Sequence, residues 1–281
     1  MNIWPIGLST GCFYQNNILD CLLTIRESGF SFIEVCSAPR HLDYHDLNAV
    51  QTAATRIHEL GMAVFSFHAP FADHIDISAI ETDRREIALR EILQAVEAAA
   101  TLNAQYLVIH PGPEHAVIPP PEERLQRMEN TVGVLNQVAR RCTELGIGCA
   151  LENKLPHLLF GNTSDILWIL DALEDMDAGA CLDTGHAHLS GDLFNLVRKL
   201  AGHLRMIHAH DNNGTGDDHL PPGDGRINWE QLLHDLSLGG FHGPLIVEMA
   251  GTESPETTMS NARRGRSWLR KISRHTALKP H

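Results

Sequence analysis

Short apolar runs alternate with longer amphipathic segments along the whole chain. The runs predict eight strands, near residues 6–12, 32–37, 63–69, 106–110, 148–152, 179–184, 205–210 and 244–249. Helical patterns follow them, near 18–28, 48–60, 82–102, 122–145, 163–174, 192–202, 228–238 and 256–274. Most of the runs are almost continuously apolar, as expected for parallel strands that are covered on both faces. The pattern therefore predicts eight strand–helix units around a parallel sheet.

The number of strand–helix units favours one closed barrel. No low-complexity linker or composition break interrupts the 281 residues, and a (β/α)8 barrel typically takes about 250. An open, doubly wound sheet would normally carry a Gly-rich phosphate turn after its first strand, and the segment STGCFYQNN at 9–17 is not such a turn. We predict a single (β/α)8 barrel that forms one domain over residues 1–281.

Side chains that bind metals or transfer protons gather where the predicted strands end. These residues are His68, His110, Glu152, Asp183 with His186, His208 with His210 and Asp211, and Glu248. Asp217, Asp218 and His219 follow in the loop after the seventh strand. In (β/α)8 barrel enzymes the loops at the carboxyl ends of the strands hold the active site. The sequence therefore predicts an enzyme whose active site lies at that face.

Four of these residues could share one metal ion. Glu152, Asp183, His208 and Glu248 come from four different predicted strands. Any one of them alone would more often be structural, but the strand ends of a closed barrel converge on its axis. Carboxylates and imidazoles in this mixture suit zinc or manganese. We predict a divalent metal cofactor, zinc or manganese.

The segment 212–229, NNGTGDDHLPPGDGRINW, combines flexible glycines with titratable side chains. We expect this loop to cover the substrate and to bring Asp217 and His219 to the site. His210, Asp211 and Trp229 are expected to contact the substrate. The alternative is a rigid connection made by the Pro-Pro-Gly at 221–223.

Charge and composition restrict the partners and the location. Lys and Arg total 22 against 35 Asp and Glu, a formal charge of −13, which repels nucleic acid and anionic membranes. The start MNIWPIGL lacks a basic segment before a long apolar stretch, and no apolar run approaches 18 residues, so neither secretion nor membrane spanning is expected. The six cysteines show no C-x-x-C pair and are interpreted as reduced thiols in a cytoplasmic protein. The sequence leaves the oligomeric state open, including a homo-oligomer.

Motifs along nearly the whole chain resemble one superfamily. They are HAPF at 68–71, HPG at 110–112, LEN at 151–153, LDTGH at 182–186, HAHDN at 208–212, DDHLPPGDGRI at 217–227 and LIVE at 245–248. In these motifs the chain resembles the xylose-isomerase-like TIM-barrel superfamily. That superfamily contains sugar and sugar-phosphate isomerases and epimerases, together with the endonuclease IV group of apurinic/apyrimidinic endonucleases.

The resemblance implies two different ligand sets. In the isomerase branch, the residues at Glu152, Asp183, His208 and Glu248 bind one metal. The endonuclease branch uses a nine-residue, three-zinc cluster, whose positions match His68, His110, Glu152, Asp183, His186, His208, Asp217, His219 and Glu248. All nine residue types are present, so the number of metal ions stays open between one and three.

Two reactions follow from these sets. We place first the isomerisation or epimerisation of a sugar or sugar phosphate, in which Glu152 and Glu248 remove and return the proton beside the carbonyl. His186 would stabilise the enediolate oxygen. The alternative is a two- or three-metal phosphoester hydrolase that acts on a small substrate, with His68, His110, His186, Asp217 and His219 as additional ligands.

The chain departs from both named branches. The endonucleases continue LEN with a TAGQG-type loop, whereas this chain reads LENKLPHLLFGNTSD. The loops after the first two strands offer only Arg40 as a strong phosphate contact, and duplex DNA binding needs several. The ketose 3-epimerases carry a second Glu where this chain has Leu158, and an Arg after the seventh strand where none precedes Arg226. Duplex DNA is therefore not expected as a partner, and a small molecule is.

Overall fold

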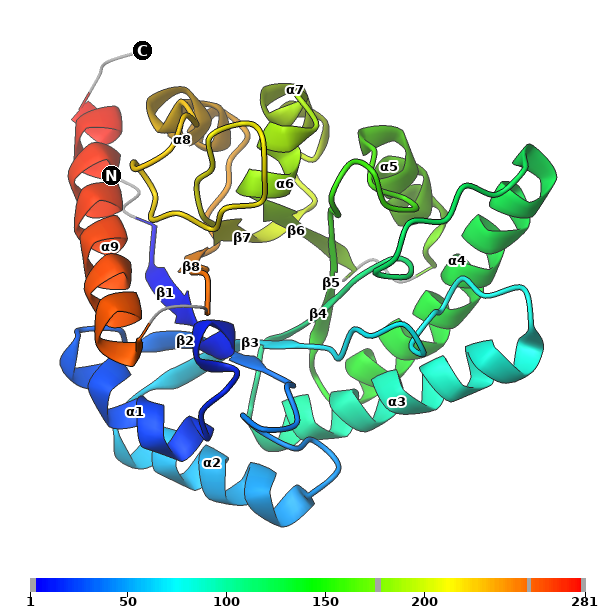
Figure 1. The fold of residues 1–281 in the computed structure, drawn as a ribbon, viewed down its shortest axis with the longest axis horizontal. Helices are drawn as coiled ribbons and strands as arrows, with labels where there is room; N and C mark the ends of the chain where they lie inside the picture. The colour runs from blue at the N-terminus through cyan, green and yellow to red at the C-terminus, as the bar shows by residue number, and fades with distance from the viewer. Residues whose placement is uncertain (1–3, 175–177, 252–253, 279–281) are drawn as a thin grey trace.

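A closed barrel of eight parallel strands forms the centre of the molecule (Figure 1). The computed structural model describes residues 4–174, 178–251 and 254–278. Each strand pairs with the next in sequence, and the last closes the barrel against the first. The strands are β1 Ile6–Ser9, β2 Phe32–Cys36, β3 Ala63–His68, β4 Tyr106–Ile109, β5 Gly148–Glu152, β6 Gly179–Asp183, β7 Leu204–Ala209 and β8 Leu245–Val247.

Helices surround the strands and cover their outer faces (Figure 1). They are α1 Ile18–Glu27, α2 Leu47–Glu59, α3 Thr82–Thr101, α4 Pro121–Glu144, α5 Thr163–Ala172, α6 Thr184–Leu189, α7 Leu193–Lys199, α8 Trp229–Leu238 and α9 Pro255–Leu278, with a short 3-10 helix η1 at Thr10–Phe13. The predicted (β/α)8 TIM barrel is confirmed. None of the helices in the described ranges combines the length and hydropathy needed to span a membrane.

The sequence pattern explains how a typical helix packs. Buried residues of α4 recur every three or four positions, at Met128, Thr131, Leu135, Val138 and Cys142, which places them on one face of the helix. This face packs against the barrel. Just beyond the helix, Gly146 has a φ of 72°, a left-handed conformation that glycine adopts without strain and that commonly ends helices.

Two strand ends and one additional helix are among the differences from the predicted elements. The first strand stops at Ser9, because the Ser9 side chain accepts a hydrogen bond from the Gly11 amide and starts η1. The last strand is only Leu245–Val247, so Glu248 lies just beyond the ladder. The short α6 was not predicted; the Asp183 carboxylate caps it by accepting a hydrogen bond from the His186 amide at 2.7 Å.

Because strand side chains alternate between two faces, a polar layer lies above a separate buried apolar cluster, which we term the apolar plug. The plug contains Phe65, Val108, Ala150, Cys181, Met206 and Ile246. Successive side chains of a strand point to opposite faces, so the next residue on the same face lies two positions further along. From five of these residues, that step leads to His110, Glu152, Asp183, His208 and Glu248. The pleat itself therefore brings the predicted site residues together at one end of the barrel.

Candidate active site

A cavity of about 180 Å³ lies at the carboxyl ends of the strands. The side chains that line it are His68, Phe71, His110, Glu114, Glu152, Lys154, Leu155, Leu158, His186, Asp217, His219 and Glu248. Seven of these were predicted as catalytic or metal-binding residues. Asp183 and His208 are fully buried directly beneath.

A larger hollow, of about 570 Å³, lies at the opposite end of the strands. Its lining includes Ala63, Tyr106, Gly148 and Arg205, and none of the described residues that line it is an Asp or a Glu. In (β/α)8 barrels this face contributes to stability, whereas the chemistry takes place at the other. The smaller cavity is therefore the candidate active site.

The carboxylate of Glu152 contacts three histidines of the site. Its Oε2 lies 3.1 Å from His68 Nε2 and 3.2 Å from His110 Nε2, and its Oε1 lies 3.0 Å from His208 Nδ1. Burial raises the pKa of Glu152, but the positive charges of His208 and His110 outweigh burial and hold it well below its ordinary value. Glu152 is therefore a buried carboxylate surrounded by imidazoles.

Glu152, Asp183, His208 and Glu248 form what we term the central group. Each offers one donor atom, and these atoms all lie within 4.8 Å of one another. Glu248 Oε2 lies 3.5 Å from His208 Nδ1. Burial raises the pKa of Asp183, but the charges of His186 and His210 lower it below its ordinary value. The structure thus brings together the four residues that were predicted to share one ion.

Two further groups of the same kind flank the central group. We term His68, His110 and Glu152 the lateral group, and His186, His210, Asp217 and His219 the loop group. Both satisfy the same limit of 4.8 Å between donor atoms. All nine residues of the predicted multinuclear set therefore lie in one continuous cluster.

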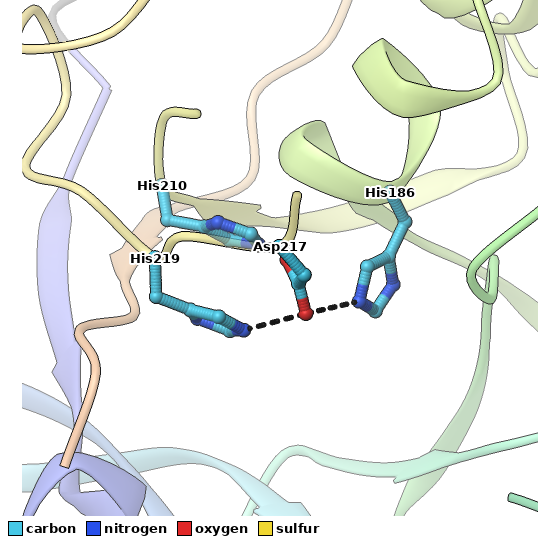
Figure 2. A group of neighbouring side chains, drawn as sticks. All are labelled: His186, His210, Asp217 and His219. Atoms are coloured by element: carbon cyan, nitrogen blue, oxygen red, sulfur yellow. Dashed lines mark hydrogen bonds and ion pairs between the residues drawn. The ribbon is translucent and has the colours of Figure 1, made fainter. Parts of the chain in front are cut away.

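The loop after β7 delivers two members of the loop group, as Figure 2 shows. Asp217 Oδ2 lies 3.2 Å from His219 Nε2 and 3.5 Å from His186 Nε2, between the two rings. His219 has a φ of 45°, uncommon for a residue with a side chain and found often at functional sites. Its ring stacks on that of His210, with centroids 3.9 Å apart. The loop therefore places Asp217 and His219 at the cavity, where the sequence analysis expected them.

Nearby carboxylates favour the protonated forms of His68 and His186. Burial lowers the pKa of His68, but the hydrogen bond to Glu152 and its charge raise it to about 9. Burial likewise lowers the pKa of His186, and the charge of Asp183 with the bond to Asp217 raises it to about 10. A divalent cation could replace these protons, because metal binding requires neutral imidazole and ionised carboxylate.

Asp211 and Trp229 lie behind the cavity instead of lining it. Both are buried, and the Asp211 carboxylate accepts hydrogen bonds from the Trp229 indole at 2.8 Å and from the amides of Asn212, Gly223 and Ile227 at 2.9–3.0 Å. These contacts anchor the 212–229 loop. Neither side chain lines the cavity, because the Asp211 carboxylate is directed toward the loop backbone. The expected contact of both residues with the substrate stays a prediction that this arrangement does not support.

His210 also lies beneath the cavity. It is fully buried, and its Nε2 lies 3.0 and 2.9 Å from the two carboxylate oxygens of Asp183. Its Nδ1 has no hydrogen-bond partner among the described residues. His210 therefore connects the central group to the loop group, and the stacked His219 separates it from the cavity.

Three residues of the site were not predicted from the sequence. Glu34, on β2, is fully buried and lies 2.9 Å from His208 Nε2. Lys154 Nζ lies 3.0 Å from a Glu114 oxygen, which in turn lies 2.7 Å from His110 Nδ1. The one available signal for Glu34 was a charged residue inside the apolar run FIEVC.

Comparisons with known proteins agree with this architecture. A family model described as a xylose isomerase-like TIM barrel matches residues 22–272. An uncharacterised protein of Methanocaldococcus jannaschii is 28% identical over 253 residues, which cover 86% of this chain and 82% of that protein. Fructoselysine 3-epimerase of Shigella flexneri is 25% identical over 169 residues, 59% of each chain. Probable endonuclease 4 of Mycobacterium leprae is 27% identical over 194 residues, 65% of this chain and 71% of that one.

Solved structures resemble the chain over almost its full length. A D-tagatose 3-epimerase-like protein has a TM-score of 0.85 at 23% identity and covers 99% of this chain and 98% of its own. D-psicose 3-epimerase, determined in the presence of D-fructose, has a TM-score of 0.82 at 15% identity, with 97% and 99% coverage. The IolI protein with a bound zinc atom has a TM-score of 0.79 at 18% identity, with 98% and 99% coverage. At these identities the likeness shows a shared fold.

Proposed function

Because the chain belongs to the xylose isomerase-like TIM-barrel family, we propose that it is a divalent-metal-dependent isomerase or epimerase of a small sugar or sugar phosphate. The observation that carries this proposal is the central group, whose two glutamates line the cavity. The epimerases among its relatives and structural neighbours support the same class of substrate.

The donor chemistry of the central group fits a zinc or manganese ion. Three carboxylates and one imidazole offer oxygen and nitrogen donors within 4.8 Å of one another, a mixture that suits both metals. The zinc atom of the IolI structure agrees with this choice. When bound, the ion supplies a Lewis acid that polarises the substrate carbonyl.

Glu152 and Glu248 are the proposed proton carriers. One removes the proton from the carbon beside the carbonyl, and the other returns a proton to complete the isomerisation or epimerisation. The side chain of Glu152 is 3% exposed and that of Glu248 is 21% exposed. The more open position of Glu248 makes it the better placed of the two to exchange its proton with solvent.

His186 is proposed to stabilise the enediolate oxygen. Its Nδ1 lies 2.9 Å from the Asn153 carbonyl oxygen, which orients the ring and requires a proton on Nδ1. With its pKa raised to about 10, the ring also carries a proton on Nε2. That second N–H faces the cavity beside Asp217 and can donate to a substrate oxygen that becomes negatively charged.

An isotope experiment tests this proposal. Zinc- or manganese-loaded protein is incubated in deuterated water with D-tagatose, D-psicose, D-fructose and phosphorylated ketoses. We expect deuterium at a carbon next to the carbonyl of at least one sugar, and exchange at least about 100-fold slower with the Glu248→Gln variant. A complete lack of exchange across the panel would overturn the proposal.

The lateral and loop groups support a second, less favoured candidate. The imidazoles and carboxylates of these two groups could bind additional metal ions. Paired ions can hold the attacking and leaving oxygens of a phosphoester. In that case His110→Ala should lower the number of zinc ions per chain below that of the wild type, and phosphodiester hydrolysis should fall with it. If His110 contacts only substrate, the metal content should stay unchanged and KM for the sugar should rise.

A further inference from the structure

We propose that Glu34 is a positioning residue, which keeps the ring proton of His208 on Nε2 and so presents the Nδ1 lone pair to a metal ion in the central group. Glu34 does not itself line the cavity or belong to the central group. The inference rests on the metal dependence proposed above and adds to it the residue that prepares one of the ligands.

Glu34 is enclosed by hydrogen-bond donors from three other strands. Its Oε1 accepts from the Ser9 hydroxyl on β1 at 2.9 Å, and its Oε2 accepts from the Ser66 hydroxyl on β3 at 2.8 Å. His208 Nε2 on β7 lies 2.9 Å from the same Oε2. The residue is 0% exposed, and a buried carboxylate is costly unless its oxygens are paired. These partners let Glu34 remain an ionised acceptor inside the barrel.

The contact with Glu34 determines where His208 carries its proton. An ionised carboxylate only accepts hydrogen bonds, so the ring nitrogen that faces it must bear the hydrogen. The other nitrogen, Nδ1, points to the opposite side, 3.0 Å from Glu152 Oε1 and 3.5 Å from Glu248 Oε2. A cation among these oxygens would replace the Nδ1 proton and meet the lone pair of the neutral ring.

A neutral side chain at position 34 would not impose this arrangement. An amide can accept from Nε2–H, or it can donate to Nε2 and shift the ring proton to Nδ1. The second tautomer points an N–H at the ion and cannot bind it. Carboxylates that orient metal-binding histidines in this way typically contribute a factor of about 10–100 to metal affinity.

A purely structural role for Glu34 makes a different prediction. Its bonds to Ser9 and Ser66 connect β1, β2 and β3, so removal of its charge could lower stability without any effect on metal binding. Metal affinity and the His208 tautomer separate the two roles, because neither depends on how firmly the three strands are held together.

The experiment compares Glu34→Gln with a matched control, Glu91→Gln. Glu91, on α3, is a glutamate that accepts hydrogen bonds from Tyr44 and His45 outside the cavity. Zinc affinity is measured by competition with a chromogenic chelator, and folding by circular dichroism. We expect Glu34→Gln to weaken zinc binding by about 10–100-fold and Glu91→Gln to leave it unchanged.

A second measurement does not require the variant to fold. In zinc-loaded wild-type protein with ¹⁵N-labelled histidine, the His208 resonances, assigned with His208→Asn, should show hydrogen on Nε2 and metal on Nδ1. Hydrogen on Nδ1, or a folded Glu34→Gln protein with wild-type zinc affinity, would overturn the role of Glu34 alone. If the wild-type chain bound neither zinc nor manganese, the metal dependence of the proposed function would fall, and this inference with it.

Discussion

Replacement of Lys154 by methionine should destabilise the protein although it removes a buried charge. The Lys154 side chain is 1% exposed, and its ammonium group lies 2.8 Å from the Gly112 carbonyl oxygen and 3.0 Å from a Glu114 oxygen. It also donates to the Pro113 carbonyl. Methionine fills a similar volume but offers no donor, so Lys154→Met leaves all three acceptors without this partner.

The size of the effect follows from these acceptors. A buried carbonyl that loses its donor costs about 1–3 kcal/mol, and two are affected. Glu114 keeps His110 as a partner and is 25% exposed, so water compensates part of its loss. The variant no longer has to bury an ammonium group, which offsets some of the cost. We expect a net loss of about 2–4 kcal/mol, equivalent to roughly 5–15 °C in Tm at about 2–4 °C for each kcal/mol.

Thermal denaturation in the presence of EDTA measures this loss without a contribution from bound metal. Lys199→Met is the matched control, because Lys199 is exposed on α7, and its Tm should change little. The double variant Lys154→Met/Glu114→Gln should recover part of the loss, since a neutral amide replaces the carboxylate that has lost its lysine partner. A Tm of Lys154→Met within about 1 °C of the wild type would refute the reasoning, since unsatisfied acceptors of this kind cost more than that.

Three further predictions concern the proposed metal site. Glu152→Gln and Glu248→Gln should each lower deuterium exchange into the sugar by at least about 10²-fold while the circular dichroism spectrum stays unchanged, because general acid–base groups contribute about 10²–10⁴-fold. Zinc at 100 times its Kd should stabilise the EDTA-treated protein by about 2.7 kcal/mol after the chelator is removed, measured by urea denaturation. In EDTA, Tm should fall as the pH rises from 6.5 to 9. Burial lowers the pKa of His219, but the hydrogen bond to Asp217 and the charge of Glu248 raise it from 6.5 to about 9. The contribution of protonated His219 to the stability of the fold is therefore complete below pH 6.5 and is lost as the pH passes through about 9.

The sequence predicted the barrel and the residues of the cluster because both depend on short-range patterns. Strands and helices alternate at a regular spacing, and the site residues occur at strand ends, where chain direction alone assigns them to one face. In the structure one further step explains the central group: Glu152, Asp183, His208 and Glu248 each lie two positions beyond an inward apolar residue. That step follows from the pleat and can be read from sequence once the strands are known.

The contacts of Glu34, Lys154 and Asp211 could not be predicted from the sequence, because they depend on how the folded chain brings these residues to their partners. Glu34 and His208 are 174 positions apart and meet only because β2 and β7 face each other across the barrel interior. Lys154 finds its acceptors on the loop after β4, 41 and 42 positions away. Asp211 follows His210 directly, yet its backbone pairs with Leu220. This pairing turns its carboxylate toward the loop amides instead of the cavity.

The division of the cluster between strands and a loop has a consequence for its chemistry. The central group is anchored on or directly beyond β5, β6, β7 and β8 above the apolar plug, so its geometry depends on the barrel itself. The loop group instead requires the 212–229 loop, which Asp211 holds through the amides of Gly223 and Ile227. Changes in that loop can therefore add or remove Asp217 and His219 while the four central donors stay in place. A proposed ion at the loop group would therefore depend on this loop, whereas one at the lateral group, on or directly beyond β3, β4 and β5, would not.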